Sequence, residues 1–72
     1  MEAESYKGYA IWGHAILEHA DILQPERYAG SGTITKSSRF VEASGVLGSF
    51  ETEEDAHVAG LAWARAWIDS HG

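Results

Sequence analysis

The stretch that decides the fold is ETEEDAHVAGLAWARAWID, residues 51–69. Thr52 is a good helix N-cap, because its hydroxyl can accept a hydrogen bond from the unpaired backbone N–H of Asp55. Acidic residues 53–55 fill the first turn, where negative charge meets the positive end of the helix dipole. Small and aromatic residues follow at helical spacing. The stretch therefore predicts a long amphipathic helix.

The two sides of this helix differ in side-chain size. At about 100° per residue, one side gathers small residues and two indoles, and we expect it to face a sheet. This side comprises Ala56, Ala59, Gly60, Trp63, Ala66 and Trp67. The other side is more apolar than most solvated helix faces. It carries Val58, Leu61, Arg65 and Ile68, a candidate protein interface, although scattered apolar residues also occur on ordinary surfaces.

Residues before the helix are typical of strands and turns. The run from 6 to 17 is rich in aromatic and β-branched residues and predicts a first strand. Residues 18–26 contain Pro25 and predict a connecting loop. Residues 27–36 alternate as a second strand that buries Tyr28, Gly30, Gly32 and Ile34. After a turn at Ser37-Ser38, residues 40–50 predict a third strand bent at Gly45.

These elements predict one α+β domain over residues 1–72, with residues 1–5 disordered. The expected fold is a three-stranded antiparallel meander with one C-terminal helix packed on one face (β-β-β-α). Gly30 and Gly32 lie on the buried side of the second strand, and we expect them to leave room for the indoles of Trp63 and Trp67. Large side chains would thus pack against small ones.

Composition narrows the function classes. The chain has 72 residues, no cysteine and a formal net charge of −6. The lack of cysteine favours a reducing cytoplasm, and the acidic start is unlike a secretory signal. Uncharged stretches are too short to cross a bilayer, so we expect no membrane segment. Overall acidity disfavours general nucleic-acid binding, because phosphate affinity comes mainly from Lys and Arg.

Two resemblances bear on the fold. The junction from Val46 to Ala56, with Ala59, is similar to the Leu-Gly-x-Phe-x-Thr-x-Glu-x-Ala pattern of AP2 and integrase-arm DNA-binding domains. This resemblance implies a strand followed by a capped helix, and DNA contacts from basic residues on an exposed sheet. The candidates for such contacts are Lys7, Arg27, Lys36 and Arg39.

The whole chain also resembles a family of short uncharacterised bacterial β-β-β-α proteins. The shared motifs are Tyr-Lys-Gly-Tyr at 6–9, Arg-Tyr-x-Gly-x-Gly at 27–32 and Gly-Leu-x-Trp-Ala-Arg-x-Trp-Ile-Asp at 60–69. A shape-level likeness to HicB-type antitoxins implies an antitoxin-like regulator as another alternative.

Motifs for chemistry are weak. His14, His19, Asp21 and His57 are residue types that bind zinc, but their spacing matches no metal motif, and we expect no metal or cofactor. Gly30-Ser31-Gly32 continues into a strand, whereas a phosphate-binding loop opens a helix. No nucleophile, base and orienting group occur at indicative spacing, so we expect no catalytic residues and no enzyme activity.

The sequence thus favours a non-enzymatic protein-interaction module that binds a partner or itself, as a dimer or larger oligomer. The binding surface would be the apolar stripe of the helix or an exposed sheet edge. The alternative is a nucleic-acid-binding sheet, with aromatic side chains such as Trp12 and Phe40 available for base stacking.

Overall fold

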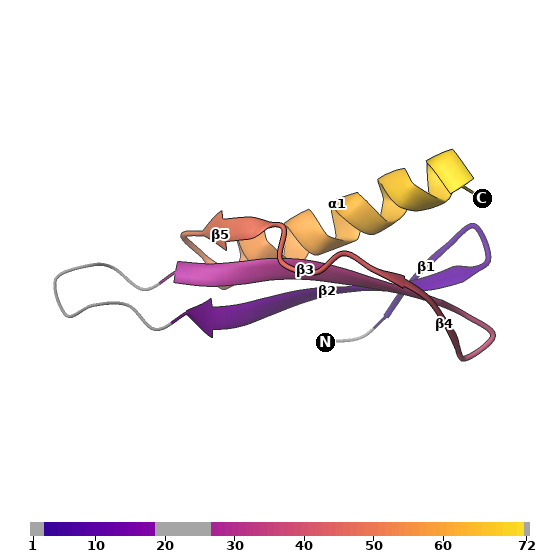
Figure 1. Ribbon diagram of the computed structural model, residues 1–72, viewed down its shortest axis with the longest axis horizontal. Helices are drawn as coiled ribbons and strands as arrows, with labels where there is room; N and C mark the ends of the chain where they lie inside the picture. Colours follow the sequence, from indigo (N-terminus) through magenta and orange to yellow (C-terminus); the bar gives the residue numbers. More distant parts are fainter. Residues whose placement is uncertain (1–2, 19–26, 72) are drawn as a thin grey trace, which may run out of the picture.

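The computed structural model describes residues 3–18 and 27–71. The elements run in the order β1 (Glu4–Tyr6), β2 (Tyr9–Glu18), β3 (Arg27–Lys36), β4 (Arg39–Ala43), β5 (Gly48–Phe50) and α1 (Glu53–His71). The strands form one antiparallel sheet in the order β1-β2-β3-β4, with β5 also paired to β3. Figure 1 shows α1 lying along one face of this sheet. The α+β class and the C-terminal helix are confirmed.

The prediction of three strands is wrong, since the described residues form five. Two-residue turns at Lys7-Gly8 and Ser37-Ser38 have positive φ at both positions, which suits the right-handed twist of a hairpin. The second turn was expected, but Lys7 is not a usual residue at positive φ, so the first hairpin was read as a single strand. Its outer strand, β1, includes Glu4 and Ser5, which were predicted to be disordered.

The predicted third strand is divided into β4 and β5. Gly45, at φ +69°, lies in the segment between them, which confirms the expected bend. The backbone N–H groups of Ser44 and Leu47 donate to Gly32 and Gly30 of β3, at 2.9 and 2.7 Å. The connecting segment therefore stays attached to the same edge of β3 that β4 and β5 occupy. The second strand has the predicted bounds, and the predicted loop at 19–26 lies outside the described residues.

Glycines bring the helix close to the sheet. A Cβ at Gly32 would lie within 3 Å of the carbonyl oxygen of Gly60 and of the Trp63 indole, so this glycine makes room for an indole as predicted. A Cβ at Gly30 would instead meet the backbone of Ala56 and the ring of Phe50. The predicted place for Trp67 is wrong, because its ring stacks on His71 with centroids 4.2 Å apart.

The core lies between α1 and the central strands. It comprises Ile11, Ile34, Leu61, Ala64 and Ile68, flanked by Tyr6, Tyr9, Val41, Trp63 and Trp67. The helix starts at Glu53, directly after the predicted Thr52 cap, whose Oγ1 accepts from Asp55 N–H at 3.0 Å as expected, and it ends at His71, two residues beyond Asp69.

The predicted orientation of the helix is partly wrong. Ala56 and Gly60 are buried as expected, but Leu61 and Ile68 are buried with them, and Ala66 is exposed. Small residues at 56, 60 and 64 form the ridge nearest the strands. The two indoles therefore lie beside the contact rather than at its centre.

Candidate interaction surface

The register of β2 and β3 assigns every residue of these strands to one of two faces. They pair without a break from Ala10 opposite Thr35 to Glu18 opposite Arg27. Side chains alternate between faces along a strand, so Ile11, Gly13, Gly32 and Ile34 share the helix side. Core and close backbone contacts with α1 agree with this assignment.

The opposite side of the sheet is here called the outer face. It is formed by alternate residues of β2 and β3, extended by two residues of β4 that pair with Thr35 and Thr33. Its members are Ala10, Trp12, His14, Ile16, Glu18, Arg27, Ala29, Ser31, Thr33, Thr35, Phe40 and Ala43. No described helix or strand covers this face in Figure 1.

The outer face is apolar at several positions, and its carboxylate and guanidinium groups are confined to one end, at the register partners Glu18 and Arg27. Ile16 is 57% exposed and Phe40 is 67% exposed, and Trp12 is half-buried. An antiparallel sheet with one solvated face usually alternates to polar and charged residues on that side. The exposed Ile16 and Phe40 nevertheless make part of this face a candidate contact surface.

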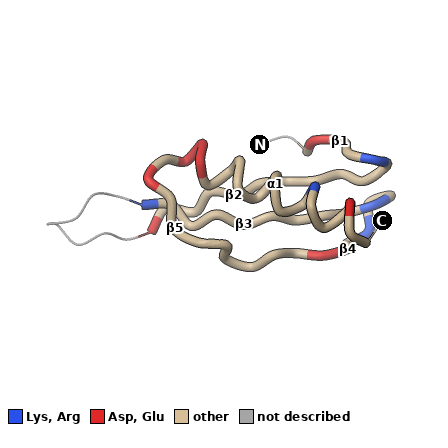
Figure 2. Tube along the Cα trace, turned by 90° about the horizontal axis from the view of Figure 1, so that it is seen from above, with Lys and Arg blue, Asp and Glu red and all other residues tan. Residues whose placement is uncertain are grey.

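Charged residues lie at the ends of the central strands. Glu18 and Arg27 pair across β2 and β3, and both bind Ser49 of β5. Glu18 accepts from the Ser49 hydroxyl at 2.6 Å, and Arg27 donates to its carbonyl oxygen at 3.1 Å. Figure 2 shows long uncharged stretches along β2 and β3, with acidic residues at the start of α1 on the other layer.

The polar groups within the outer face are partly satisfied by one another. Nε2 of His14 and Oγ1 of Thr33 hydrogen-bond across the strand pair at 3.0 Å. A buried hydroxyl or imidazole costs little when it keeps a partner, and much when it loses one. This pair can therefore be covered by an apolar surface at lower cost than two unpaired groups.

The predicted interface on the helix is not an exposed stripe. Leu61 and Ile68 are 8% and 1% exposed and belong to the core, so that part of the prediction is wrong. Val58 is 50% exposed, and Arg65 forms an ion pair with Glu4 of β1. The reason is the rotation of α1 described above, which turns this side partly toward the sheet.

Three of the four predicted nucleic-acid contacts, Lys7, Lys36 and Arg39, lie at one end of the sheet, and Arg27 lies at the other end. Arg27 and Lys36 stand at opposite ends of β3, about 30 Å apart at 3.4 Å per residue. Lys36 lies over the ring of Tyr9, and Lys7 pairs with Asp69 at 2.6 Å. Arg39 begins β4 next to the Ser37-Ser38 turn. They form no single basic track along the sheet.

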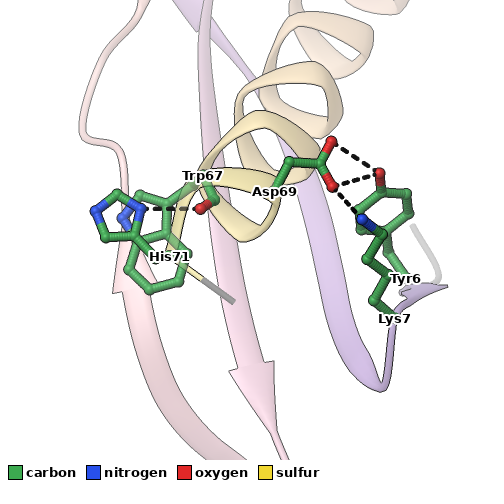
Figure 3. A network of polar contacts seen from close by, with 5 residues as sticks. All are labelled: Tyr6, Lys7, Trp67, Asp69 and His71. Carbon is green, nitrogen blue, oxygen red and sulfur yellow. Dashed lines mark hydrogen bonds and ion pairs between the residues drawn. The ribbon is translucent and has the colours of Figure 1, made fainter.

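Asp69 ties the end of the helix to the first hairpin, as Figure 3 shows. Tyr6 donates its hydroxyl to both carboxylate oxygens at 2.9 and 3.0 Å, and Lys7 donates at 2.6 Å. The hydrogen bonds from Lys7 and then Tyr6 lower the pKa of Asp69. The same bonds to Asp69 raise the pKa values of Lys7 and Tyr6. The cluster is exposed and links the β1–β2 hairpin to the end of α1.

The histidines considered as metal ligands lie apart. His14 is on the outer face, whereas Nδ1 of His57 donates to the carbonyl oxygen of Gly13 on the helix side, at 2.9 Å. His19 and Asp21 lie outside the described residues. Within residues 3–18 and 27–71, no three His, Asp or Glu side chains are close enough to hold an ion.

Comparisons with protein-family models, curated proteins and solved structures found no match for this chain. In the described part of the chain, no helix combines the length and hydropathy needed to cross a membrane.

The sequence analysis did not single out the outer face as a site. One signal was available, since the second strand was predicted to bury its glycine side. Its other side therefore had to be Arg27, Ala29, Ser31, Thr33 and Thr35, which after Arg27 are small or hydroxylated and uncharged. The matching side of β2 needed the register, because the hairpin turn at Lys7-Gly8 was not recognised.

Proposed function

We propose that this protein is a non-enzymatic protein-interaction module that binds its partner through the outer face of the sheet. The observation that carries the proposal is a partly apolar sheet face that exposes Ile16 and Phe40 and whose charged residues, Glu18 and Arg27, lie at one end. Aromatic residues such as Trp12 are enriched where interfaces gain most of their free energy. A cysteine-free composition favours a cytoplasmic location for this module.

The alternative function, nucleic-acid binding, has one feature in its favour. Trp12 and Phe40 offer aromatic rings on a sheet face, and such rings can stack bases. Affinity would still depend on phosphate neutralisation, and the basic residues are divided between the two ends of the sheet, with Lys36 and Arg39 at the β3–β4 turn and Arg27 at the far end. Binding to mixed DNA and RNA should then fall steeply with salt and be lost in Arg39→Ala.

Site-specific photocrosslinking tests the protein-interaction function. A photoreactive phenylalanine analogue replaces Ile16 on the outer face or, as control, Val58 on the helix. These two aliphatic residues are similarly exposed, at 57% and 50%. In cells that produce the protein naturally, position 16 should give a discrete protein adduct that position 58 does not. Absence of any adduct at 16, or equal adducts at both positions, would contradict the proposal.

A further inference from the structure

We propose that the open edge of β2 pairs with the same edge of a second copy of this chain, antiparallel about a twofold axis at Ile16. The contact joins two sheets edge to edge through backbone hydrogen bonds and leaves most of the outer face open. The inference therefore goes beyond the proposed function and uses a different surface. It rests on the direction of the backbone groups of β2 and on the order of its side chains.

Half of the backbone groups of β2 point away from β3. In an antiparallel ladder, the N–H and C=O of one residue point to the same side, and those of the next residue point to the other side. Gly30 and Gly32 of β3 bond to the segment between β4 and β5, so their backbone groups point away from β2. Their register partners, Ala15 and Gly13, therefore point away from β3, as does Leu17 by alternation.

These outward groups have no strand beside them in the described part of the chain. β1 pairs only with residues 9–11, and β2 continues well beyond it (Figure 1). The carbonyl oxygen of Gly13 accepts from Nδ1 of His57 on the helix. The N–H and C=O groups of Ala15 and Leu17 remain. An extended segment that adds to a sheet edge bonds to groups arranged in this way.

Apolar side chains flank this open edge on both faces. Ile16 is 57% exposed on the outer face, and Leu17 is 52% exposed on the helix side. Natural edge strands usually discourage pairing through lysine, proline or a bulge. The segment Gly13–Leu17 has no lysine or proline, and its register with β3 is continuous. It therefore lacks the features that keep an edge strand unpaired.

The order of the side chains favours a second copy as the added strand. With Ile16 on the axis, each Ala15 faces Leu17 of the other copy, and these pairs exchange about four backbone hydrogen bonds in all. A large side chain then lies opposite a small one on the helix side. The two Ile16 side chains meet on the outer face, and each His14 faces Glu18 of the other copy. No like charges stand directly opposite each other, which would destabilise the pairing.

The carbonyl of Gly13 sets the register. An axis at Ala15 would place Leu17 of the second copy opposite Gly13, where the His57 ring already binds the carbonyl oxygen and lies close to the backbone. An axis at Ile16 ends the ladder one residue before Gly13.

Charge and size limit the strength of the contact. Ala56 packs against Gly30, which pairs with Ala15, so the acidic first turn of α1 lies near the level of the axis in both copies. Repulsion between these turns is long-range and is screened by salt. A short ladder is also smaller than a standard interface. We therefore expect a weak dimer, with a dissociation constant of about 100 μM or more, that salt strengthens.

Single cysteines test the register, because the chain has none of its own. In Ile16→Cys, the paired Cα atoms would lie about 4.5 Å apart, within disulfide range. Mild oxidation of the full chain at about 200 μM should therefore give a disulfide dimer. The matched control is His14→Cys, on the same face and edge, whose two copies would stand about 14 Å apart. Equal disulfide yields at both positions would overturn the register.

Analytical ultracentrifugation gives a readout without cysteine. The wild type should begin to dimerise above about 100 μM, and more readily in high salt. Leu17→Lys should weaken association at least tenfold, because an edge lysine opposes strand pairing. The control Val58→Lys makes the same change in charge on the helix, at 50% exposure against 52% for Leu17. It should leave association unchanged, and circular dichroism verifies that both variants are folded.

Three outcomes would overturn the inference: a wild type that stays monomeric at about 1 mM, equal effects of the two lysine variants, or a dimer that salt weakens. The proposed function is decided separately. Photocrosslinking at position 16 to another protein, in a chain that stays monomeric, would support binding through the outer face and contradict the edge pairing.

Discussion

The two faces of the β2–β3 pair have the same strands, the same register and opposite surroundings. The helix side is made of isoleucines at one end and glycines in the middle, and α1 covers it so closely that backbones nearly touch. The outer side exposes Ile16, Phe40 and part of Trp12 to solvent. A residue's contribution to stability therefore depends on its parity in the strand rather than on its hydrophobicity.

The largest expected difference is between two isoleucines on opposite faces. Ile34 is fully buried, so Ile34→Ala should lower the free energy of unfolding by about 3 kcal/mol through lost burial and the cavity left behind. Ile16→Ala on the outer face should cost about 0.5 kcal/mol or less. Urea unfolding at low micromolar concentration, where the monomer dominates, measures both. Equal losses would show that the outer face is already packed within one chain.

A smaller effect tests the close approach of the helix. Alanine is normally a better helix former than glycine by about 1 kcal/mol. A Cβ at Gly60 would nevertheless meet the backbone of Ser31, so Gly60→Ala should destabilise the fold by about 2 kcal/mol. Ala62→Gly, at an exposed position of the same helix, should cost only the propensity difference. Thermal melts followed by circular dichroism compare them, and a stabilised Gly60→Ala would mean that the two backbones are further apart.

The Thr52 N-cap should contribute moderately to the stability of the helix that covers the sheet. Thr52→Ala removes the acceptor for the Asp55 N–H and should cost about 1 kcal/mol in the free energy of unfolding. Thr52→Ser keeps the hydroxyl and should be close to the wild type. The comparison is made by chemical denaturation at neutral pH. If serine and alanine destabilise equally, the loss comes from the threonine methyl group and not from the cap.

The smallest expected effect is pH-dependent and concerns the contacts of Asp69 with Tyr6 and Lys7 at the end of the helix. The pKa of Asp69 is lowered in the folded state, so its contribution to stability is present above the unfolded pKa and is lost as pH falls through the folded value. Asp69→Asn should therefore lower Tm at pH 7 and make little difference at pH 2. Calorimetry across this range checks the convergence of the two curves. A constant gap in Tm would mean that the carboxylate charge is not involved.

Several parts of the fold could be read from local sequence. The capped, acidic start of the helix, the bounds of β3 and the turn at Ser37-Ser38 follow from short-range chemistry that acts within a few residues. The β1–β2 hairpin could not be predicted, because Lys7 adopts a positive φ that is unusual for lysine. The division into β4 and β5 was visible only as a bend at Gly45.

The candidate site was less predictable than the fold. Leu61 and Ile68 share a helix side with Val58, so periodicity grouped them as one stripe, yet the contact of Gly60 with Ser31 and Gly13 rotates the helix and buries them. A rotation of this size is set by the shape of both partners. The periodicity of the helix sequence describes the helix surface only and carries no information on the sheet surface.

Local chemistry along the chain thus specifies one capped helix, a glycine-sided strand and an acidic C-terminal layer, because caps, alternation and charge act between near neighbours. Pairing between distant segments specifies the rest. The register of β2 against β3 places Trp12, His14 and Ile16 on one face with Ala29 and Thr33. The helix α1 packs against Gly32 and covers only the opposite face. The outer face exists because residues far apart in the chain share a parity that no single segment reveals.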